Sequence, residues 1–456
     1  MLPSSVAVVS DAVLTRRLTM DVTHRSCCGV DVHQAVVVAC VIVQDGRRKR
    51  QRKEVRSFST VASGLKEMAQ WIQSMGCTCV AMESTGVYWM PVYEMLEGVV
   101  PNVIVANARH IKNVPGRKTD VCDSMWICEL ARHGLLKPGF VPPRPIRQLR
   151  ELTRQRHRLV QSAATERNRL IKVLERHGVK LSTFLSDVFG VSGRQIILAL
   201  IAGKATPEQM AQLAKGTLKK KAADIQQALE APLDDAARFV LKSQYEHVVA
   251  TEKRIAALDD EIDKNLKPHE EAQKRLESIV GVGAVSFAAI IGEIGTDLSS
   301  FPNQRAFSSW CGLSPGNNMS AGKRANSPTN LGNCFLRSLL VECAWAAIKS
   351  PGYLKTKYYK LKSRRGAKRA IVAIAHKLAI AVYQVLRQKT EYKELPVEHL
   401  ERAKKQHLEK AARKLSANGY VVLKPTVPAE PEPKAELTAP KRSKKYKRKA
   451  IRTDPD

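Results

Sequence analysis

NVIVANARHIKNVPGRKTDVCDSMWICELARHG, residues 102–134, joins a short apolar run to a helical pattern through a basic loop. The run at 103–106 predicts a buried strand, and proline and glycine interrupt the loop that follows it. The helical pattern begins near Thr119, a residue suited to an N-cap, so Asp120 and Asp123 fall in the first turn, where carboxylates complement the helix dipole. Positions i and i+3 share a helix face, so both carboxylates can point at one spot. A lone DxxD motif is more often a pair of ordinary helix-start acids.

The sequence ahead of this stretch predicts an α/β domain. Residues 28–43 are rich in β-branched side chains and indicate one strand, which a basic turn, GRRKRQRK at 46–53, connects to a second strand at 54–59. Residues 61–76 carry apolar side chains at helical spacing, and a further buried strand follows at 77–82. An alternation of strands and helices of this kind is typical of α/β folds.

Two more acids stand at positions where such folds place their chemistry. Asp31 lies early in the first strand, and Glu83 follows the strand at 77–82. The carboxyl ends of strands are where α/β sheets bind ligands. We therefore expect Asp31, Glu83, Asp120 and Asp123 to converge. Hard cations such as Mg²⁺ prefer oxygen ligands, and two of them about 4 Å apart can hold the attacking and leaving oxygens of a phosphodiester. Each acid alone is equally well explained as a solvated turn residue.

Three motifs carry a resemblance to a known family. They are GVDVHQ at 29–34, ESTGVYWMPVYEMLE at 83–97 and NARHIKNVPGRKTDVCDSMWICELARHGLL at 107–136. They resemble the DEDD-type insertion-sequence transposases, the family numbered one hundred and ten, and its eleven-eleven subgroup. The resemblance implies an RNase H-like domain similar to the junction resolvase RuvC, with Asp31, Glu83, Asp120 and Asp123 as a tetrad that holds Mg²⁺, two ions in all. Arg117 and Lys118, in the basic loop, are candidate nucleic-acid contacts.

The next part of the chain predicts long helices. Apolar side chains follow a loose heptad pattern from Leu149 to Leu174, with Arg156 interrupting it. A paired helix, within the chain or across a dimer, is one interpretation, and a single amphipathic surface helix is nearly as well supported. The arginines of the outer face could follow phosphates; they are Arg154, Arg156, Arg158, Arg167 and Arg169. A second helical block at 206–275 indicates a return arm, and in the family this region resembles a coiled-coil connector.

The region after residue 275 predicts a mainly helical domain. Gly281 and Gly283 flank a turn between two apolar helical pieces, which resembles a helix-hairpin-helix whose amides approach a DNA phosphate, although a turn inside a core fits as well. A loop at 312–333 is rich in Gly, Asn and Ser. Its Lys323 and Arg324 suit a hydroxyl presented beside a phosphate, and chemistry alone does not choose among the candidate hydroxyls, Ser314, Ser320 and Ser327. In the family, a loop of SGGK type carries an essential serine; SAGK at 320–323 places that serine at Ser320, with Ala321 where glycine is usual.

Composition limits the remaining possibilities. Seventy-five Lys and Arg against 43 Asp and Glu give a net charge of +32, which favours a polyanionic partner. Ten cysteines without CxxC pairs indicate reduced, buried thiols in a cytoplasmic protein, and the apolar runs are too short to span a membrane. The sequence therefore predicts a multidomain α/β plus α protein: a disordered extension at 1–26, the RuvC-like catalytic domain at 27–144, the connector at 145–275, the C-terminal transposase domain at 276–395, and a charged, disordered basic tail at 396–456.

Three functions fit these features. The first is an insertion-sequence transposase that acts on donor ends and target DNA, with Mg²⁺ at the tetrad and Ser320 as nucleophile. The resemblance also implies a bridge RNA that pairs with both DNAs, and a homo-oligomer, dimer or tetramer. The second is a metal-dependent nuclease or junction resolvase with no serine intermediate. The third is a basic nucleic-acid-binding scaffold whose acids are structural, and this explanation requires four acids to match the family motifs by coincidence.

Overall fold

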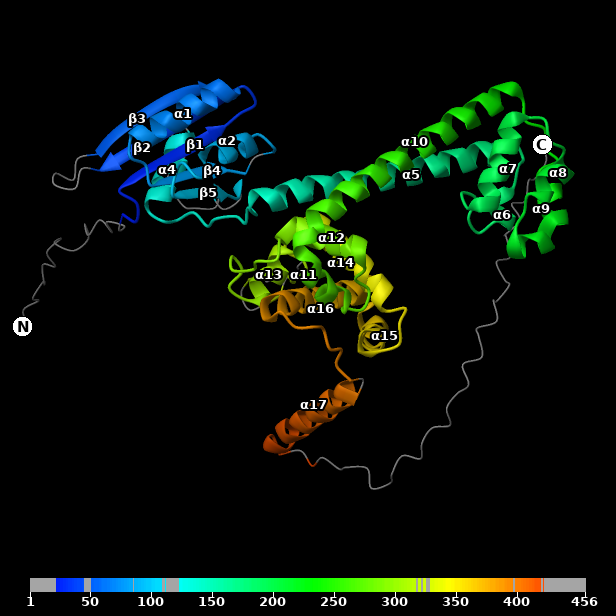
Figure 1. Ribbon diagram of the computed structural model, residues 1–456. Helices are drawn as coiled ribbons and strands as arrows, with labels where there is room; N and C mark the ends of the chain where they lie inside the picture. Colours follow the sequence, from blue (N-terminus) through cyan, green and yellow to red (C-terminus); the bar gives the residue numbers. More distant parts are fainter. Residues whose placement is uncertain are drawn as a thin grey trace, which may run out of the picture.

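The computed structural model describes residues 22–44, 51–84, 86–108, 111, 123–316, 319–320, 323–324, 329–396, 398–419 and 421. Figure 1 shows an α/β domain at the N-terminal side, from which a long pair of helices extends to a small helical cap. A second helical domain lies beside the near half of the long pair (Figure 1). In chain order these parts are the sheet domain, the long helix pair with its cap, and the second helical domain.

The N-terminal domain is built on a mixed five-stranded sheet. Its strand order is β3-β2-β1-β4-β5, in which β1, β2 and β3 pair antiparallel and β1, β4 and β5 pair parallel. This arrangement is consistent with the RNase H-like fold that the resemblance implies. The elements are β1 Ser26–Val32, β2 Val36–Gln44, β3 Gln51–Ser59, α1 Ala62–Ser74, β4 Cys79–Glu83, α2 Trp89–Leu96, β5 Asn102–Ala106 and α4 Asp123–Arg132.

One strand prediction was wrong. Residues 28–43 form parts of two strands, β1 and β2, and a reversal at His33–Ala35 separates them; the His33 N–H donates to the Val36 carbonyl at 3.0 Å. The reversal contains neither glycine nor proline, so the usual sequence signal of a turn is missing.

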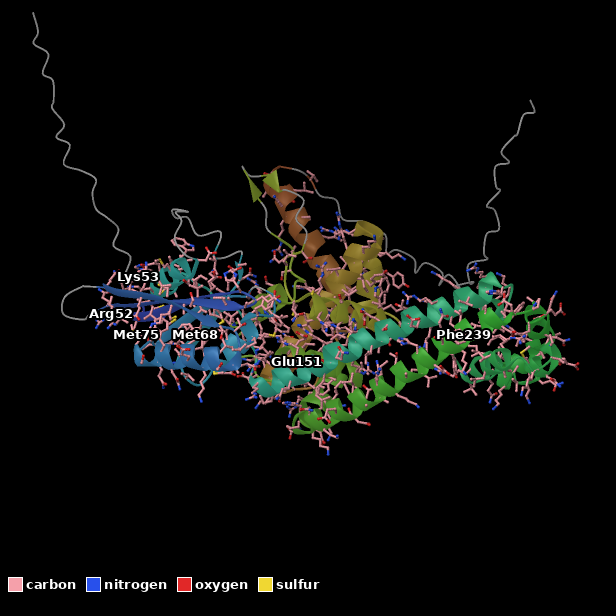
Figure 2. All side chains as sticks on the ribbon, turned by 90° about the horizontal axis from the view of Figure 1, so that it is seen from above. Arg52, Lys53, Met68, Met75, Glu151 and Phe239 are labelled. Carbon is pink, nitrogen blue, oxygen red and sulfur yellow. The ribbon has the colours of Figure 1, made fainter. Side chains whose placement is uncertain are left out.

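The expected hairpin exists as β2 and β3, and β3 is an edge strand. Arg52 and Lys53 lie on it (Figure 2), where charged side chains discourage further strand pairing.

The two faces of the sheet bury different helices. Side chains alternate along a strand, so Val30 and Met82 point toward α1, where Leu65, Met68 and Ile72 are buried with them. Cys27, Cys79 and Ala81 point to the other face and pack against Ile127 and Cys128 of α4. The nine described cysteines are free thiols, and all but Cys334 are buried, as the sequence indicated.

The connector is a helix pair within one chain. α5, Arg144–Arg176, is 33 residues long, about 50 Å, and α10, Asp235–Leu266, returns along it. The pairing confirms one of the two helix interpretations. Three of the five arginines expected on an outer face form ion pairs within the chain instead: Arg156 pairs with Asp259, Arg167 with Glu252 and Arg154 with Glu293. The sequence pattern could not show this because the partners are about a hundred residues away.

A compact cap closes the far end of the pair. The sequence predicted a second helical block at 206–275. The block begins with short helices at 207–228, which pack with the short helices at 181–202 around a core that includes Leu181, Ile196, Ile197 and Ile225. Thr206 and Gln209 form a capping box at one of them, a local signal that begins a new helix. The elements are α6 Leu181–Phe184, α7 Val191–Ala202, α8 Pro207–Gln212, η1 Gly216–Lys221 and α9 Ala222–Ala228.

The C-terminal domain packs its helices around α16, Ala367–Gln388. Within the described residues this is the one helix long and apolar enough to cross a membrane, longer than any apolar run expected from the sequence, but Ile374, Leu378 and Val382 bury it in the domain core. The other elements are η2 Lys267–His269, α11 Glu270–Glu277, α12 Ala284–Ile294, α13 Gln304–Trp310, β6 Met319–Ser320, β7 Lys323–Arg324, α14 Cys334–Ala347 and α15 Tyr353–Arg365.

The segment after residue 396 begins with a helix where disorder was expected. α17, Glu398–Ala417, lies apart from the other helices in Figure 1. Its Glu, Lys, Ala and Leu residues have high helix propensity, which the low hydrophobicity of the segment concealed. The residues after 421, and those before 22, lie outside the described part of the chain.

Candidate functional site

Two of the predicted acids meet at one edge of the sheet. β1 and β4 pair parallel, with Val30 opposite Met82, so Asp31 and Glu83 directly follow paired residues at the carboxyl ends of neighbouring strands. Both belong to the alternating set that faces α4, together with Cys27 on β1 and Cys79 on β4. The topology therefore brings Asp31 and Glu83 together, as the sequence predicted.

Gly29 brings the third acid to the same place. A Cβ on Gly29 would lie 2.1 Å from the Ser124 carbonyl oxygen and 2.3 Å from the Cys128 backbone nitrogen. Only glycine allows this contact, so the first turn of α4 rests on β1 beside Asp31. Asp123 is the first residue of that helix. The signal that sequence reasoning missed is the glycine two residues before Asp31, on the same face of the strand.

A Gly29→Ala substitution is expected to lower the free energy of unfolding by about 3 kcal/mol, because backbone atoms cannot yield to the new methyl group as a flexible side chain would. The matched control is Gly283→Ala, where a Cβ would meet nothing within 4 Å. Urea denaturation followed by circular dichroism measures both. Equal stability of the two variants would contradict the close approach of α4 to β1.

The electrostatics of Asp31 report the convergence. Partial burial raises the pKa of Asp31, and the negative charges of Asp123 and Glu83 raise it further, while His33 opposes them. His33 Nε2 lies 3.0 Å from Asp31 Oδ2. Like charges raise a carboxyl pKa only where they are near, so Asp123 and Glu83 both add negative charge to the surroundings of Asp31. A cation bound among them would relieve this repulsion.

The donor set suits a hard divalent cation. Carboxylate oxygens are the ligands that Mg²⁺ takes in proteins. Among the described residues, however, no group of three or more potential ligands has a geometry that would hold a metal ion. Asp120, the fourth acid of the predicted tetrad, lies outside the described residues, as do Arg117 and Lys118. The oxygens of Asp31, Glu83 and Asp123 are thus of the kind that binds a divalent cation, and these three residues would supply part of such a site.

The loop that carries Ser320 has a tight neck. Asn330 donates its backbone N–H to the Ser314 carbonyl at 3.0 Å, and Asn333 donates to the Trp310 carbonyl at 2.8 Å. A Cβ on Gly332 would lie 2.4 Å from the Gly312 nitrogen, so glycine lets the two sides of the neck touch. Beyond the neck, β6 and β7 pair with Ser320 opposite Lys323. The two short strands β6 and β7 thus bring the backbone of Ser320 next to that of Lys323.

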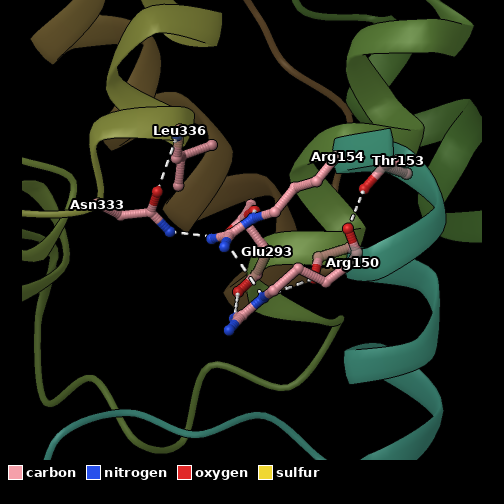
Figure 3. Close-up of polar contacts among 7 residues, drawn as sticks. Arg150, Thr153, Arg154, Glu293, Asn333 and Leu336 are labelled. Atoms are coloured by element: carbon pink, nitrogen blue, oxygen red, sulfur yellow. Dashed lines mark hydrogen bonds and ion pairs between the residues drawn. The ribbon is translucent and has the colours of Figure 1, made fainter. Parts of the chain in front are cut away.

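A buried carboxylate anchors this neck to the connector. The Glu293 side chain, on α12, is fully buried and accepts two hydrogen bonds from Arg154, at 2.6 and 2.9 Å, and one from Asn333 Nδ2 at 2.6 Å. Arg150 Nε lies 3.4 Å from the same carboxylate. Asn333 also caps α14 by accepting from the Leu336 N–H (Figure 3). Glu293 therefore holds α5, α12 and the start of α14 in one polar cluster.

The Glu293→Leu substitution is expected to lower the free energy of unfolding by about 3 kcal/mol, because it leaves the part-buried guanidinium groups of Arg150 and Arg154 without their shared carboxylate. The control is Glu261→Leu, which removes an exposed ion pair with Lys264 on α10 and is expected to cost at most about 1 kcal/mol. Urea denaturation compares the two. A Glu293→Leu variant as stable as wild type would show that the cluster does not hold these helices together.

The two glycines of the predicted helix-hairpin-helix have different surroundings, one packed against the core and the other open to solvent. Gly281 has a φ of +90°, and a Cβ there would lie 2.3 Å from the Cys343 carbonyl oxygen, so this glycine packs against α14. Gly283 precedes α12 and faces open space. Gly281 thus serves helix packing, and contact between nucleic acid and the hairpin stays a prediction.

The segment between α4 and α5 contacts both domains. Val141 packs against the α1 side of the sheet domain. The centroid of the Phe140 ring lies 4.9 Å from that of Phe301 and 5.4 Å from that of Trp310. Arg147 of α5 donates to the Glu97 carboxylate at 2.7 and 3.1 Å. These contacts hold the acid-bearing domain next to the domain that carries Ser320.

Comparison with known proteins matches both halves of this arrangement. Residues 28–178 match a model of DEDD transposases of the IS110 type, and residues 273–360 match the model described as transposase, IS116/IS110/IS902 family. The chain belongs to this family of transposases. The first match covers the three described acids and the second covers the Ser320 loop.

Individual relatives agree with this assignment. The transposase is 26% identical over 378 residues to the transposase for insertion sequence element IS1111A of Coxiella burnetii, covering 80% of this chain and 90% of the relative. It is also 29% identical over 147 residues to the putative transposase y4pF/y4sB of Sinorhizobium fredii, covering 31% of this chain and 38% of that protein. The transposase is thus an enzyme that acts on DNA.

Proposed function

We propose that this transposase cuts and rejoins DNA with Ser320 as nucleophile, assisted by a divalent cation held by Asp31, Glu83, Asp120 and Asp123. The observation that carries the proposal is the placement of Asp31, Glu83 and Asp123 at one edge of the sheet, where burial and the charges of the other two acids raise the pKa of Asp31. Such a cluster of carboxylates gains most from a bound cation. Mg²⁺ is the proposed ion, two per site, and it would polarise the scissile phosphate and stabilise the charge that develops on it.

In the proposed reaction Ser320 is the nucleophile and the acids assist proton transfer and cation binding. The Ser320 hydroxyl attacks phosphorus, its proton passes to a base of the tetrad, and the bond between phosphorus and the DNA oxygen breaks as that oxygen leaves and takes up a proton. The product is a phosphoserine ester of DNA and a free hydroxyl end. Attack of a second DNA hydroxyl on that ester reverses these steps and releases Ser320. Because one ester replaces another, rejoining needs no outside energy.

The acids and Ser320 come from different domains, so the site is composite. We infer a homo-oligomer, dimer or tetramer, in which the serine loop of one subunit meets the acids of another. The guide in this proposal is a bridge RNA that pairs with donor and target DNA and supplies sequence choice, as in other guide-directed enzymes. The net charge of +32 supports a polyanionic partner of this kind.

The test is a trapped intermediate. Wild-type protein is incubated with Mg²⁺, end-labelled donor and target DNA and the RNA transcribed beside the gene, and the mixture is separated on a denaturing gel. A labelled band at the protein's size, with phosphoserine located by mass spectrometry in the peptide that contains Ser320, supports the proposal. DNA cleavage without any adduct would overturn it in favour of a hydrolytic nuclease.

A further inference from the structure

Net charge alone does not show which cations of this protein are available to a ligand. On α5, four arginines are already paired with carboxylates of α10 and α12: Arg150, Arg154, Arg156 and Arg167. The helix α15 and the first turn of α16 differ. α15 contains no acid, and its sequence YLKTKYYKLKSRR continues into AKR of α16. Positive charge without neighbouring carboxylates is therefore concentrated at the corner between these two helices.

α15 is held as a platform by its inner face. Tyr353, Leu354 and Tyr358 are buried against the C-terminal core. At its start, the Leu354 N–H donates to the Glu394 carboxylate at 2.9 Å, which fixes the first turn. On the other side of the helix, residues 359, 360 and 362–365 are exposed to solvent. This anchoring means that the outer side chains are presented from a rigid element.

Five cations at this corner have no carboxylate partner among the described residues. Lys362, Arg364, Arg365, Lys368 and Arg369 are all exposed, and none of them makes an ion pair within the part of the chain that the structure describes. Lys368 and Arg369 stand in the first turn of α16, where the helix dipole disfavours positive charge. Crowded like charges at an unfavourable helix end cost stability in the free protein. A polyanion bound there would offset that cost.

Aromatic rings lie beside these cations. The Tyr359 side chain is 54% exposed and that of Trp345 is 44% exposed. Both rings pack against the buried Tyr358, with centroids 5.3 Å and 5.8 Å away, and Lys362 Nζ lies 5.7 Å from the Tyr359 centroid. Exposed rings held by a buried neighbour are preorganised for stacking on flat groups. Cations that follow phosphates, with rings that stack on unpaired bases, are the features by which proteins bind single strands.

We propose that α15, the first turn of α16 and Trp345 form a binding surface for a single-stranded segment of nucleic acid, with the cations on its phosphates and Tyr359 and Trp345 against its bases. A duplex would meet the cations but offer no base faces to the rings, which is why a single strand fits better. The inference deepens the proposed function by assigning a nucleic-acid surface to the C-terminal domain. Binding there requires neither the acids nor Ser320.

The first test compares two triple variants of equal charge change. One replaces Lys362, Arg364 and Arg365 with Gln, and the control replaces Lys219, Lys220 and Lys221 of η1, which are exposed on the distant cap. Fluorescence anisotropy measures the affinity for single-stranded RNA, single-stranded DNA and a duplex over a range of salt. We expect the α15 triple to bind single strands at least about tenfold more weakly, with a salt slope lower by about 2, and the control to bind like wild type. Equal losses in both triples would overturn the inference, since they would reflect net charge alone.

The second test separates stacking from charge. Tyr359→Ala is expected to weaken single-strand binding by about tenfold, and Tyr359→Phe, which keeps the ring, to retain it. Duplex binding is expected to stay unchanged in both. A Tyr359→Ala variant that binds single strands like wild type, or that loses duplex affinity equally, would overturn the inference. The RNA and DNA arms show which strand the surface takes. Because the assay measures binding alone, a failure of the catalytic proposal would leave these results unaffected.

Discussion

A Ser320→Ala variant is expected to form no covalent DNA adduct and to lose strand transfer by roughly a millionfold, the scale on which enzymes lose rate when a nucleophilic serine is removed. Alanine lacks the hydroxyl that forms the ester to phosphorus, and no neighbouring group takes its place in the proposed chemistry. Ser320 lies on β6, where its backbone pairs with Lys323 of β7, and the substitution removes one oxygen. Denaturing gels of reactions with end-labelled DNA measure adduct and joined product together.

The control for this variant comes from the same loop. Ser314 lies at the neck, and its backbone carbonyl, which any residue can supply, accepts from Asn330. Ser314→Ala is therefore expected to keep both adduct and joined product near wild-type levels. If Ser320→Ala still cuts DNA at the wild-type rate, the enzyme hydrolyses DNA directly and Ser320 is not the nucleophile. If Ser314→Ala loses the adduct instead, the nucleophile has been assigned to the wrong hydroxyl of the loop.

Local sequence could predict those site residues that lie at the end of a strand or at the start of a helix. Glu83 follows a short apolar strand, and Asp123 begins a helix; both positions follow from periodicity and from the known preference of α/β folds for chemistry at strand ends. The family resemblance then linked these acids with Asp31. The strand order and the α4 side of the sheet agree with that prediction.

The part that could not be predicted depends on contacts between distant residues. Nothing local marks Gly29 as the point where α4 touches β1, because its meaning depends on Ser124 and Cys128 about a hundred residues later. The arginines of α5 look like a phosphate-binding face until their partners on α10 and α12 are known. The turn at 33–35 carries no glycine or proline, so two strands looked like one. In each case a tertiary contact decides what the local pattern leaves open.

These contacts also explain how two separate domains can act on one DNA. The segment around Phe140 and the Glu293 cluster fix the serine-bearing domain to the base of the connector, and the connector begins where the acid-bearing domain ends. In the proposed mechanism each chain therefore carries the acids and Ser320 in a defined relation. An active site formed between subunits would depend on these contacts for its geometry, even though they touch no DNA.

The last prediction concerns the acids. An Asp31→Asn variant is expected to lose both strand cleavage and strand transfer by roughly a thousandfold, because a carboxylate that helps hold a catalytic cation supports about 4 kcal/mol of transition-state stabilisation. The fold is expected to remain, and its stability near neutral pH to be unchanged or raised. The reason is that the folded protein raises the pKa of Asp31 through burial and the nearby charges of Asp123 and Glu83, so the neutral amide removes a repulsion.

The matched control is Asp263→Asn on α10, which removes the same charge from an exposed position away from the sheet and is expected to leave activity and stability unchanged. DNA binding by Asp31→Asn, measured by anisotropy, is expected to equal or exceed that of wild type, since a negative charge is lost. In the proposed mechanism Asp31→Asn and Ser320→Ala both lose cleavage and adduct, because the cut is itself the attack of Ser320 on phosphorus; cleavage that Asp31→Asn loses and Ser320→Ala keeps would instead indicate a hydrolytic nuclease. An Asp31→Asn enzyme that joins DNA at the wild-type rate would show that these acids are structural, and the catalytic role of the tetrad would fall with it.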